Sequence, residues 1–377
     1  MKKILVLEPY YGGSHKQFLD GLCHHVSAEY TLMTLPARKW KMRMQLAAPW
    51  FYKQIRKLES QKRYFDTVLC STFVDVGMLK GLLSGLNGWN PSARFLTYFH
   101  ENQFSYPGQI PDPTRFQFTA INFNSGLVSD GIAFNTIYNY ESFLKGCRKY
   151  IKKAADMDLV WVIDALRKKS TVLYPPLDFT CIDRGGRKKN NRVPVIVWNH
   201  RWEHDKNPED FFNTLTELEL NRIDFRLILL GQKFRFYPDC FDRAMERFET
   251  KIFHCGYVES YDRYVTFLKQ ADIVISTAFH EFYGISVIEA VRAGCYPLLP
   301  DRLSYPELFE PRFLYREGDL TARLQEVIQD RKSLDDMEIR TITDRLSWGA
   351  MREKYRSWLQ AGPVEKECNL NPALRSP

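Results

Sequence analysis

Two glutamates in the second half of the chain have types and spacing suited to holding the hydroxyl groups of a sugar and of a ribose. Seven residues separate Glu281 from Glu289, and they include Tyr283, Gly284 and Ile285. Hydrophobic periodicity places Glu281 in a loop after a strand and Glu289 on the helix that begins near Gly284. The glycine allows close approach of the backbone to a ligand, and the N–H groups that open the helix attract negative charge. These four features together predict a binding site for an anionic, sugar-bearing ligand.

A basic pair follows another predicted strand, residues 193–198. Arg201 and Lys206 lie in a polar loop, and Pro208 is suited to the first turn of the next helix. An arginine can grip two phosphate oxygens at once, whereas a lysine acts as a point charge. The pair therefore predicts a clamp for a diphosphate, with a solvated charged turn as the alternative interpretation.

A glycine pair lies between the first predicted strand, residues 4–7, and the helix after it. Gly12 and Gly13 would let backbone N–H groups approach an anion, with Ser14 and His15 beside them. The spacing matches neither G-x-G-x-x-G nor a Walker A sequence, which argues against an ordinary dinucleotide fold and a P-loop ATPase. A tight strand-to-helix turn without a ligand is the alternative.

A polar run, His100, Glu101 and Asn102, comes directly after the predicted strand of residues 94–99. Carboxyl ends of parallel strands face the ligand-binding crevice in α/β sheets. A neutral histidine in that position can hydrogen-bond a sugar hydroxyl. A loop histidine bonded to the backbone is the alternative.

The elements that would position these residues alternate between strand and helix, which predicts parallel sheets covered on both faces. The alternation breaks at residues 174–176 (Tyr-Pro-Pro) and at the basic loop 184–192. We therefore expect an α/β protein with two doubly wound, Rossmann-like parallel-sheet domains facing a cleft. The expected parts are an N-terminal domain (1–176), a linker (177–192), a C-terminal domain (193–345), a helix that packs back on the N-terminal domain (346–362) and a frayed tail (363–377).

Composition excludes several other classes. The 377 residues carry a net charge of +8 and are 45% hydrophobic, which is typical of a globular protein with an anionic partner. No apolar run approaches a membrane span, and the apolar run near the N-terminus is too short for a signal peptide. Eight cysteines occur without a C-x-x-C pair or a zinc spacing. We expect a cytoplasmic protein that needs no metal and no membrane.

Residues 39–57 mix cations with aromatic side chains, and Lys39, Lys41 and Arg43 lie at the start of this segment. Such a mixture suits phosphates and unpaired bases of an RNA. It is equally compatible with an amphipathic helix on a membrane surface, which would serve a lipid acceptor.

Sequence segments around these residues resemble the retaining GT-B enzymes of glycosyltransferase family 4. They are more similar to the tRNA-queuosine α-mannosyltransferase family, and the resemblance extends from residue 3 to about residue 359. The segments are EPYYGGSHKQFLDGL, TLPARKWKMR, YFHENQFSYP, WNHRWEHDKNPEDFF and ISTAFHEFYGISVIEAVRAGCYPLLPDRLSYPELF. One departure is His200, which stands where family 4 usually has a glycine before the arginine.

The resemblance implies GDP-mannose as donor and the cyclopentenediol of queuosine in a tRNA anticodon as acceptor. It also implies roles for residues. His100, Arg201, Lys206 and Glu281 would be catalytic. The donor would contact Gly12, Gly13, Arg201, Lys206, Glu281, Tyr283, Gly284, Ile285 and Glu289. From position and charge rather than from the resemblance, we expect the acceptor side to include Ser14, His15, Lys39, Lys41, Arg43, Glu101 and Asn102.

No metal is expected in this chemistry, because the cations and helix N–H groups would stabilise the departing diphosphate. Asp156-Met157-Asp158 spells the D-x-D signature of metal-dependent glycosyltransferases, but it lies in the helix-like stretch 152–162, where we do not expect metal binding. Two alternatives stay open. One is a family-4 enzyme with a lipid or small glycoside acceptor, and the other is a non-catalytic RNA-binding protein on a transferase scaffold.

Overall fold

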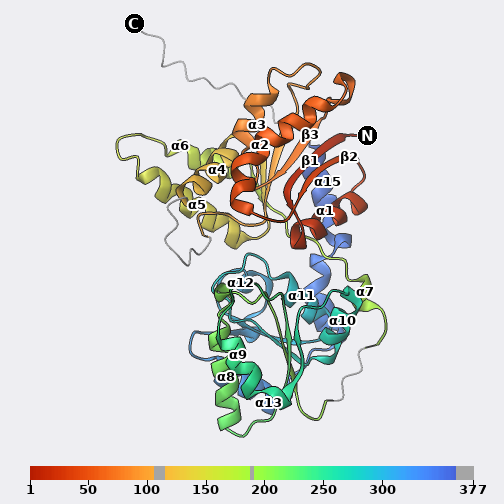
Figure 1. Ribbon diagram of the computed structural model, residues 1–377, viewed down its shortest axis with the longest axis vertical. Coiled ribbons are helices and arrows are strands. Elements are labelled where there is room, and N and C mark those ends of the chain that lie inside the picture. The colour runs from red at the N-terminus through yellow and green to blue at the C-terminus, as the bar shows by residue number, and fades with distance from the viewer. Residues whose placement is uncertain (106–114, 187–190, 362–377) are drawn as a thin grey trace.

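The chain folds into two lobes, one above the other, and the computed structural model describes residues 1–105, 115–186 and 191–361 (Figure 1). Each lobe has a six-stranded sheet in which all strands are parallel. This arrangement confirms the predicted α/β class with two doubly wound domains.

The N-terminal sheet has the strand order β2-β1-β3-β4-β5-β6. Its strands are β1 (Lys3–Tyr11), β2 (Glu29–Pro36), β3 (Thr67–Ser71), β4 (Arg94–Phe99), β5 (Gly131–Phe134) and β6 (Ser170–Val172). Helices of this lobe are α1 (Gly13–His25), α2 (Trp40–Lys57), α3 (Val76–Leu83), α4 (Arg115–Val128), α5 (Ile137–Lys152) and α6 (Trp161–Lys168). The central strands are mostly apolar and almost completely buried, because helices cover both faces of the sheet.

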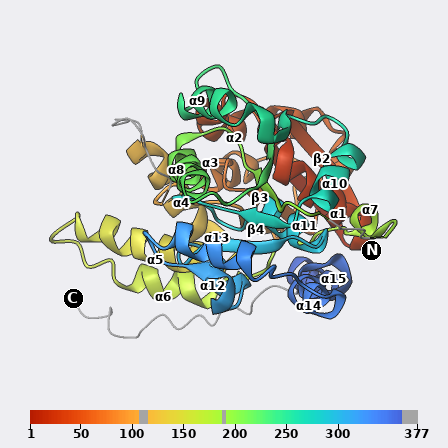
Figure 2. The ribbon, with the colours of Figure 1, turned by 90° about the horizontal axis from the view of Figure 1, so that it is seen from below.

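The C-terminal sheet has the strand order β12-β11-β10-β7-β8-β9. Its strands are β7 (Val195–Asn199), β8 (Arg226–Leu230), β9 (Ile252–Gly256), β10 (Ile273–Ile275), β11 (Tyr296–Pro300) and β12 (Leu314–Tyr315). Its helices are α7 (Thr180–Asp183), α8 (Pro208–Leu220), α9 (Cys240–Arg247), α10 (Tyr261–Gln270), α11 (Ile285–Arg292), α12 (Tyr305–Leu308), α13 (Leu320–Gln329) and α14 (Asp336–Thr343). Seen from below, α8 and α13 lie next to each other on this lobe (Figure 2).

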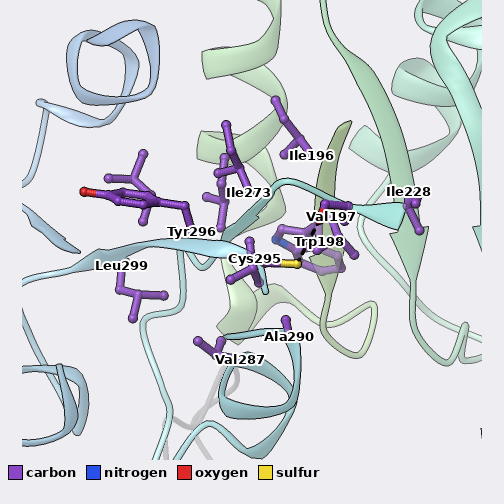
Figure 3. Close-up of a cluster of buried hydrophobic side chains, with 14 of the residues drawn as sticks. Ile196, Val197, Trp198, Ile228, Ile273, Val287, Ala290, Cys295, Tyr296 and Leu299 are labelled. Atoms are coloured by element: carbon purple, nitrogen blue, oxygen red, sulfur yellow. Dashed lines mark hydrogen bonds between the residues drawn. The ribbon is translucent and has the colours of Figure 1, made fainter. Parts of the chain in front are cut away.

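The core of the C-terminal lobe holds α11 firmly against its sheet. Val287 and Ala290 of α11 point toward Trp198 and Cys295, with strand residues such as Val197 beside them (Figure 3). All five are completely buried. The start of α11 is therefore fixed relative to the ends of β7 and β10.

The predicted linker is partly an ordered piece of the C-terminal lobe. Residues 180–183 form α7, and Phe179 and Ile182 are buried in that lobe's core. Arg292 also holds Asp183 through two hydrogen bonds of 2.7 Å. The expectation of a plain linker over 177–192 is wrong for this part, and residues 187–190 of the basic loop lie outside the described residues.

A fifteenth helix, α15 (Trp348–Gln360), crosses back to the N-terminal lobe and lies beside α1 (Figure 1). Trp348 and Tyr355 are buried against Phe18 and Tyr98. The chain passes between the lobes twice, and the two passages are hydrogen-bonded where Leu177 N–H meets the Leu346 carbonyl at 2.9 Å.

The Asp156/Asp158 stretch is not helical, contrary to the expectation for residues 152–162. Helix α5 ends at Lys152, α6 begins at Trp161, and Ala155 has a left-handed φ of 52° in the turn between them. Within the described ranges, no group of three or more His, Cys, Asp or Glu side chains is arranged to hold a metal ion. No helix of those ranges has the length and apolar character needed to cross a bilayer.

The contact between α1 and α15 leads to a prediction about stability. A Cβ added at Gly21 would lie 2.5 Å from the Trp348 ring, so Gly21→Ala must displace the indole. We expect a loss of about 1–3 kcal/mol in the free energy of unfolding, as is typical of overpacking. Urea denaturation of the two-lobe protein measures it.

Gly81→Ala is the matched control. Gly81 is an exposed helical glycine of α3, and an added Cβ there meets nothing within 4 Å. This variant should be neutral or up to about 1 kcal/mol more stable because alanine favours helix. Equal effects of the two substitutions would contradict the proposed packing of α15.

Candidate active site

The carboxyl ends of the two sheets face each other, and polar contacts join the lobes there. Thr136, which precedes α5, donates its hydroxyl hydrogen to the Phe282 carbonyl at 2.9 Å. The Glu307 carboxylate of α12 accepts hydrogen bonds from the Ile137 and Tyr138 N–H groups at 3.0 and 2.8 Å. The loops that carry the predicted site residues therefore meet between the lobes.

Lys206 is the buried cation of the site. Its Nζ donates to the His280 carbonyl at 2.6 Å and lies 3.2 Å from Asp205 Oδ2 and 3.4 Å from Glu281 Oε2. Burial alone would lower the pKa of this ammonium, but the two carboxylates outweigh it and raise the pKa above its usual value. Lys206 is thus a fixed positive charge at neutral pH.

Glu281 is the partner of Lys206 and is held by the backbone as well. Its Oε1 accepts from the N–H groups of Phe282 and Tyr283 at 3.1 and 3.3 Å. Burial raises the pKa of this carboxyl, but Lys206 more than compensates, so the pKa is lowered overall. Gly284 follows with a left-handed φ of 88° and caps α11, whose first residue is Ile285. The structure therefore brings Lys206, Glu281 and the start of α11 together.

Arg201 is placed differently from Lys206. Its side chain is 51% exposed, and its Nη2 lies 3.0 Å from the Glu203 carboxylate. A diphosphate would have to replace Glu203 as the partner of the guanidinium. The predicted clamp thus consists of one fixed cation and one cation that must change its partner.

Glu289 lies in the second turn of α11 and is buried. Its carboxylate accepts hydrogen bonds from the hydroxyls of Tyr261 and Tyr264 at 2.9 and 3.1 Å. Gln17 of α1 also bonds to it across the cleft, and burial raises the pKa of this carboxyl. A ribose would have to take the place of one of these partners.

The glycine pair lies between β1 and α1, as the sequence predicts. Gly13 has a left-handed φ of 51°, whereas Gly12 is extended but would bring a Cβ within 2.6 Å of Ala37 Cβ. Ser14 is exposed, and His15 is buried on the inner side of α1.

His15 lies between two carboxylates. Its Nδ1 is 3.0 Å from Glu8 Oε2, and its Nε2 is 3.4 Å from Glu101 Oε2. Burial would lower the pKa of this imidazole, but the two carboxylates raise it to about 10. The neighbouring His100 ring, 4.1 Å away between centroids, has its pKa lowered by burial and then by charged His15. His100 is therefore neutral, as a hydrogen-bonding role toward a sugar requires.

Asn102 does not face the cleft. It is completely buried, its amide nitrogen donates to Asn139 Oδ1 at 2.8 Å, and its oxygen accepts from the Phe104 and Ser105 N–H groups. Its expected contact with an acceptor is thus corrected to support of the loop after β4.

Residues 40–57 form α2, and one apolar face of it points inward, whereas Met42 and Leu46 are exposed. Met44, Phe51 and Ile55 are completely buried in the N-terminal lobe. Lys39 and Lys41 are exposed, and Arg43 is half-buried. The structure thus supplies a basic surface on α2 and packs most of its apolar face into the protein core.

Several residues of the site were missed from the sequence. Asp205, Tyr261 and Tyr264 hold Lys206 and Glu289, although nothing in their spacing predicts it. Glu8 had a signal, because it interrupts the apolar run of the first strand, where a charged residue is rarely buried without a partner. Gly231 was also missed. A Cβ there would lie 1.9 Å from the His200 carbonyl oxygen, so the loop after β7 can approach the end of β8 only because residue 231 is a glycine.

Solved structures with low sequence identity share the whole fold. The catalytic domain of starch synthase IV from Arabidopsis thaliana, bound to ADP and acarbose, has a TM-score of 0.69 at 12% identity, over 95% of this chain and 98% of that one. Sucrose-phosphate synthase from Thermosynechococcus elongatus has a TM-score of 0.68 at 11% identity, over 94% and 97% of the two chains. This likeness establishes the two-domain GT-B fold.

Sequence comparison gives the family. Residues 3–177 match the tRNA-queuosine alpha-mannosyltransferase N-terminal family, and residues 182–343 match the glycosyl transferases group 1 family. A tRNA-queuosine alpha-mannosyltransferase from Drosophila melanogaster is 32% identical over 331 residues, which cover 85% of each chain. This GT-B protein therefore belongs to the tRNA-queuosine alpha-mannosyltransferase family.

Proposed function

We propose that this chain transfers mannose from GDP-mannose to the cyclopentenediol of queuosine in a tRNA anticodon, with retention of the anomeric configuration. The observation that carries the proposal is the pair of buried Lys206 and partly buried Glu281 at the start of α11, in a chain whose Drosophila relative is named for this reaction. One charged group is suited to the leaving diphosphate and the other to the hydroxyls of the sugar.

The transfer step is a front-face substitution. The acceptor hydroxyl attacks the anomeric carbon from the side on which the diphosphate departs. The bond from that carbon to the diphosphate breaks, the new glycosidic bond forms, and a diphosphate oxygen takes the acceptor proton. Negative charge grows on the leaving group, so a fixed cation there binds the transition state more strongly than the ground state.

The donor would bind in stages. The N–H groups that open α11 are in position without rearrangement, whereas the Lys206 ammonium already has three acceptors and exchanges one of them for a diphosphate oxygen. Arg201 joins them after it leaves Glu203, and Glu289 binds the ribose after it exchanges a tyrosine or Gln17. His100, neutral and beside the cleft, would hydrogen-bond the transferred sugar.

A tRNA acceptor is favoured over a lipid by the packing of α2. A membrane-surface helix needs its apolar face free, whereas Met44, Phe51 and Ile55 of α2 are buried and leave Met42 and Leu46 as its exposed large apolar side chains. The exposed cations at its start are suited to phosphates. The described cysteines are all free thiols, which fits the cytoplasm that we propose as the location.

Removing charge from the donor site should slow transfer. Arg201→Ala is expected to lower kcat by about two orders of magnitude or more, as the loss of one charge-stabilising donor typically does. Glu281→Gln should also lower kcat, because the amide neither pairs with Lys206 nor positions the sugar as firmly. Steady-state kinetics with tRNA and GDP-mannose measures both.

Arg312→Ala is the matched control, since Arg312 is similarly exposed and pairs with Glu310 at 3.0 Å. Its kcat should equal that of the wild type. Wild-type turnover in Arg201→Ala and Glu281→Gln would place the site elsewhere. A wild-type protein that binds tRNA without transfer or donor hydrolysis would favour the non-catalytic alternative.

Activity is expected to survive removal of divalent metal. The proposed chemistry neutralises the diphosphate with Arg201, Lys206 and N–H groups, so EDTA should leave kcat nearly unchanged. Asp156→Ala should likewise have little effect, because Asp156 lies in the turn between α5 and α6. A strict requirement for added Mg²⁺ or Mn²⁺ would contradict this mechanism.

Neutralising the start of α2 should weaken tRNA binding. The variant replaces Lys39, Lys41 and Arg43 by glutamine, and it should bind tRNA less tightly and with a shallower dependence on salt, because fewer counterions are released. Donor hydrolysis should hardly change. Affinity measured at several salt concentrations gives the slope, and the control variant replaces three exposed cations of the other lobe, Arg243, Arg316 and Arg331. An unchanged slope would remove α2 from the tRNA surface.

A further inference from the structure

The N-terminal lobe contains a buried charged cluster, Glu8–His15–Glu101, that the donor chemistry does not use. Glu8 lies at the end of the regular part of β1 and is 1% exposed. Its Oε1 accepts from the Ser71 hydroxyl at 3.1 Å and from the Tyr10 N–H at 2.7 Å, and its Oε2 faces His15. A buried ion pair is often no more stable than apolar packing, so its presence in an apolar strand needs a reason other than stability.

His15 must be an imidazolium in this geometry. Each of its two ring nitrogens faces a carboxylate oxygen, at 3.0 Å for Glu8 and 3.4 Å for Glu101. A neutral ring has only one N–H, so it would turn a lone pair toward one of the carboxylates. The charged ring satisfies both, and it links Glu8 to Glu101.

Glu101 is the member of the cluster that reaches the cleft. Side-chain exposure rises from 2% for Glu8 and 6% for His15 to 16% for Glu101. One carboxylate oxygen accepts from the Thr72 hydroxyl at 3.0 Å, and the other faces His15. Each oxygen can accept a further hydrogen bond. The orientation of this carboxylate is fixed, and two acceptor positions remain.

The cluster lies next to the reacting centre of the proposed reaction. His100 precedes Glu101, and the centroids of the His100 and His15 rings are 4.1 Å apart. If His100 contacts the transferred sugar, the attacking hydroxyl must lie close to Glu101. Two carboxylates and one imidazolium leave the cluster with one net negative charge, which suits hydroxyl donors.

We propose that Glu101 binds the two adjacent hydroxyls of the acceptor diol, and that Glu8 is a positioning residue that acts through His15. This inference rests on the proposed function and assigns its acceptor subsite. Glu8 keeps His15 charged, and charged His15 keeps Glu101 in the orientation that accepts a hydrogen bond from each hydroxyl. Loss of the Glu8 charge would let His15 lose its proton near neutral pH and release Glu101.

The test of Glu8 is a pH profile. Glu8→Gln keeps the shape of the side chain but removes its charge. The groups that face His15 are then Glu101 and His100 from the loop after β4 and the Tyr10 ring from β1, with Phe73 as an uncharged neighbour. We expect kcat/KM for queuosine-containing tRNA to fall about tenfold or more as the pH rises from 6 to 8.5 in Glu8→Gln, and to show no such fall in the wild type.

Ser71→Ala is the matched control, because it removes one hydrogen bond to Glu8 and leaves the charge. Its profile should run parallel to that of the wild type. Glu101→Gln should raise KM for the modified tRNA about tenfold or more, since hydrogen bonds to a charged group contribute about 1.5–3 kcal/mol.

The stability of the wild type gives an independent check. The pKa of His15, raised to about 10, means that its contribution to the free energy of unfolding is complete below about pH 6.5 and is lost as the pH rises toward 10. This loss should be absent from Glu8→Gln.

A Glu8→Gln profile parallel to that of the wild type, or an unchanged KM in Glu101→Gln, would overturn the inference. Absence of any transfer by the wild-type protein would instead overturn the proposed function. The two failures are therefore distinguishable.

Discussion

The ion pair between Lys206 and Glu281 is the contact on which the donor side of the cleft depends. It joins the loop after β7 to the loop after β10, and the His280 carbonyl and Asp205 complete the surroundings of the ammonium. Because Lys206 is buried, loss of its charge would leave the carboxylates of Asp205 and Glu281 without the cation between them, which is costly in a protein interior. The start of α11 is held in the same place by the core beneath it, so cation, carboxylate and helix N–H groups form one rigid surface.

The opposite wall is built by the same principle. A buried imidazolium, His15, lies between Glu8 and Glu101, just as the Lys206 ammonium lies between Asp205 and Glu281. Each wall therefore holds one buried cation between two carboxylates. Helix α1 connects the walls, because His15 faces one cluster and Gln17 reaches Glu289 of the other.

Much of the fold could be predicted from the sequence because each central strand is an apolar run that ends in polar residues. This pattern located β4 before His100 and β7 before Arg201, and it placed both loops at the cleft. Edge strands β6 and β12 were not predicted, because their three and two residues are too few to show the hydrophobic pattern of a strand. The first strand was predicted to end before Glu8, because a carboxylate in a core is unfavourable until its partner is known.

The details of the site could not be predicted for a related reason. Sequence spacing indicates which face of an element a side chain occupies, but the partner across a loop depends on tertiary packing. Glu203 as partner of Arg201, two tyrosines as partners of Glu289, and the burial of Asn102 are all of this kind. Pro175 and Pro176 correctly marked the passage between the lobes, whereas α7 inside the predicted linker is fixed by Arg292 from a distant helix.

Analysis of the product nucleoside shows whether this protein transfers mannose to queuosine. Queuosine-containing tRNA would be incubated with the protein and GDP-mannose, digested to nucleosides and analysed by mass spectrometry, with the anomeric configuration read by NMR. Our account predicts that queuosine gains one hexose in the α configuration and that tRNA lacking queuosine gains none. Unchanged queuosine, a hexose on another nucleoside, or an inverted linkage would contradict it.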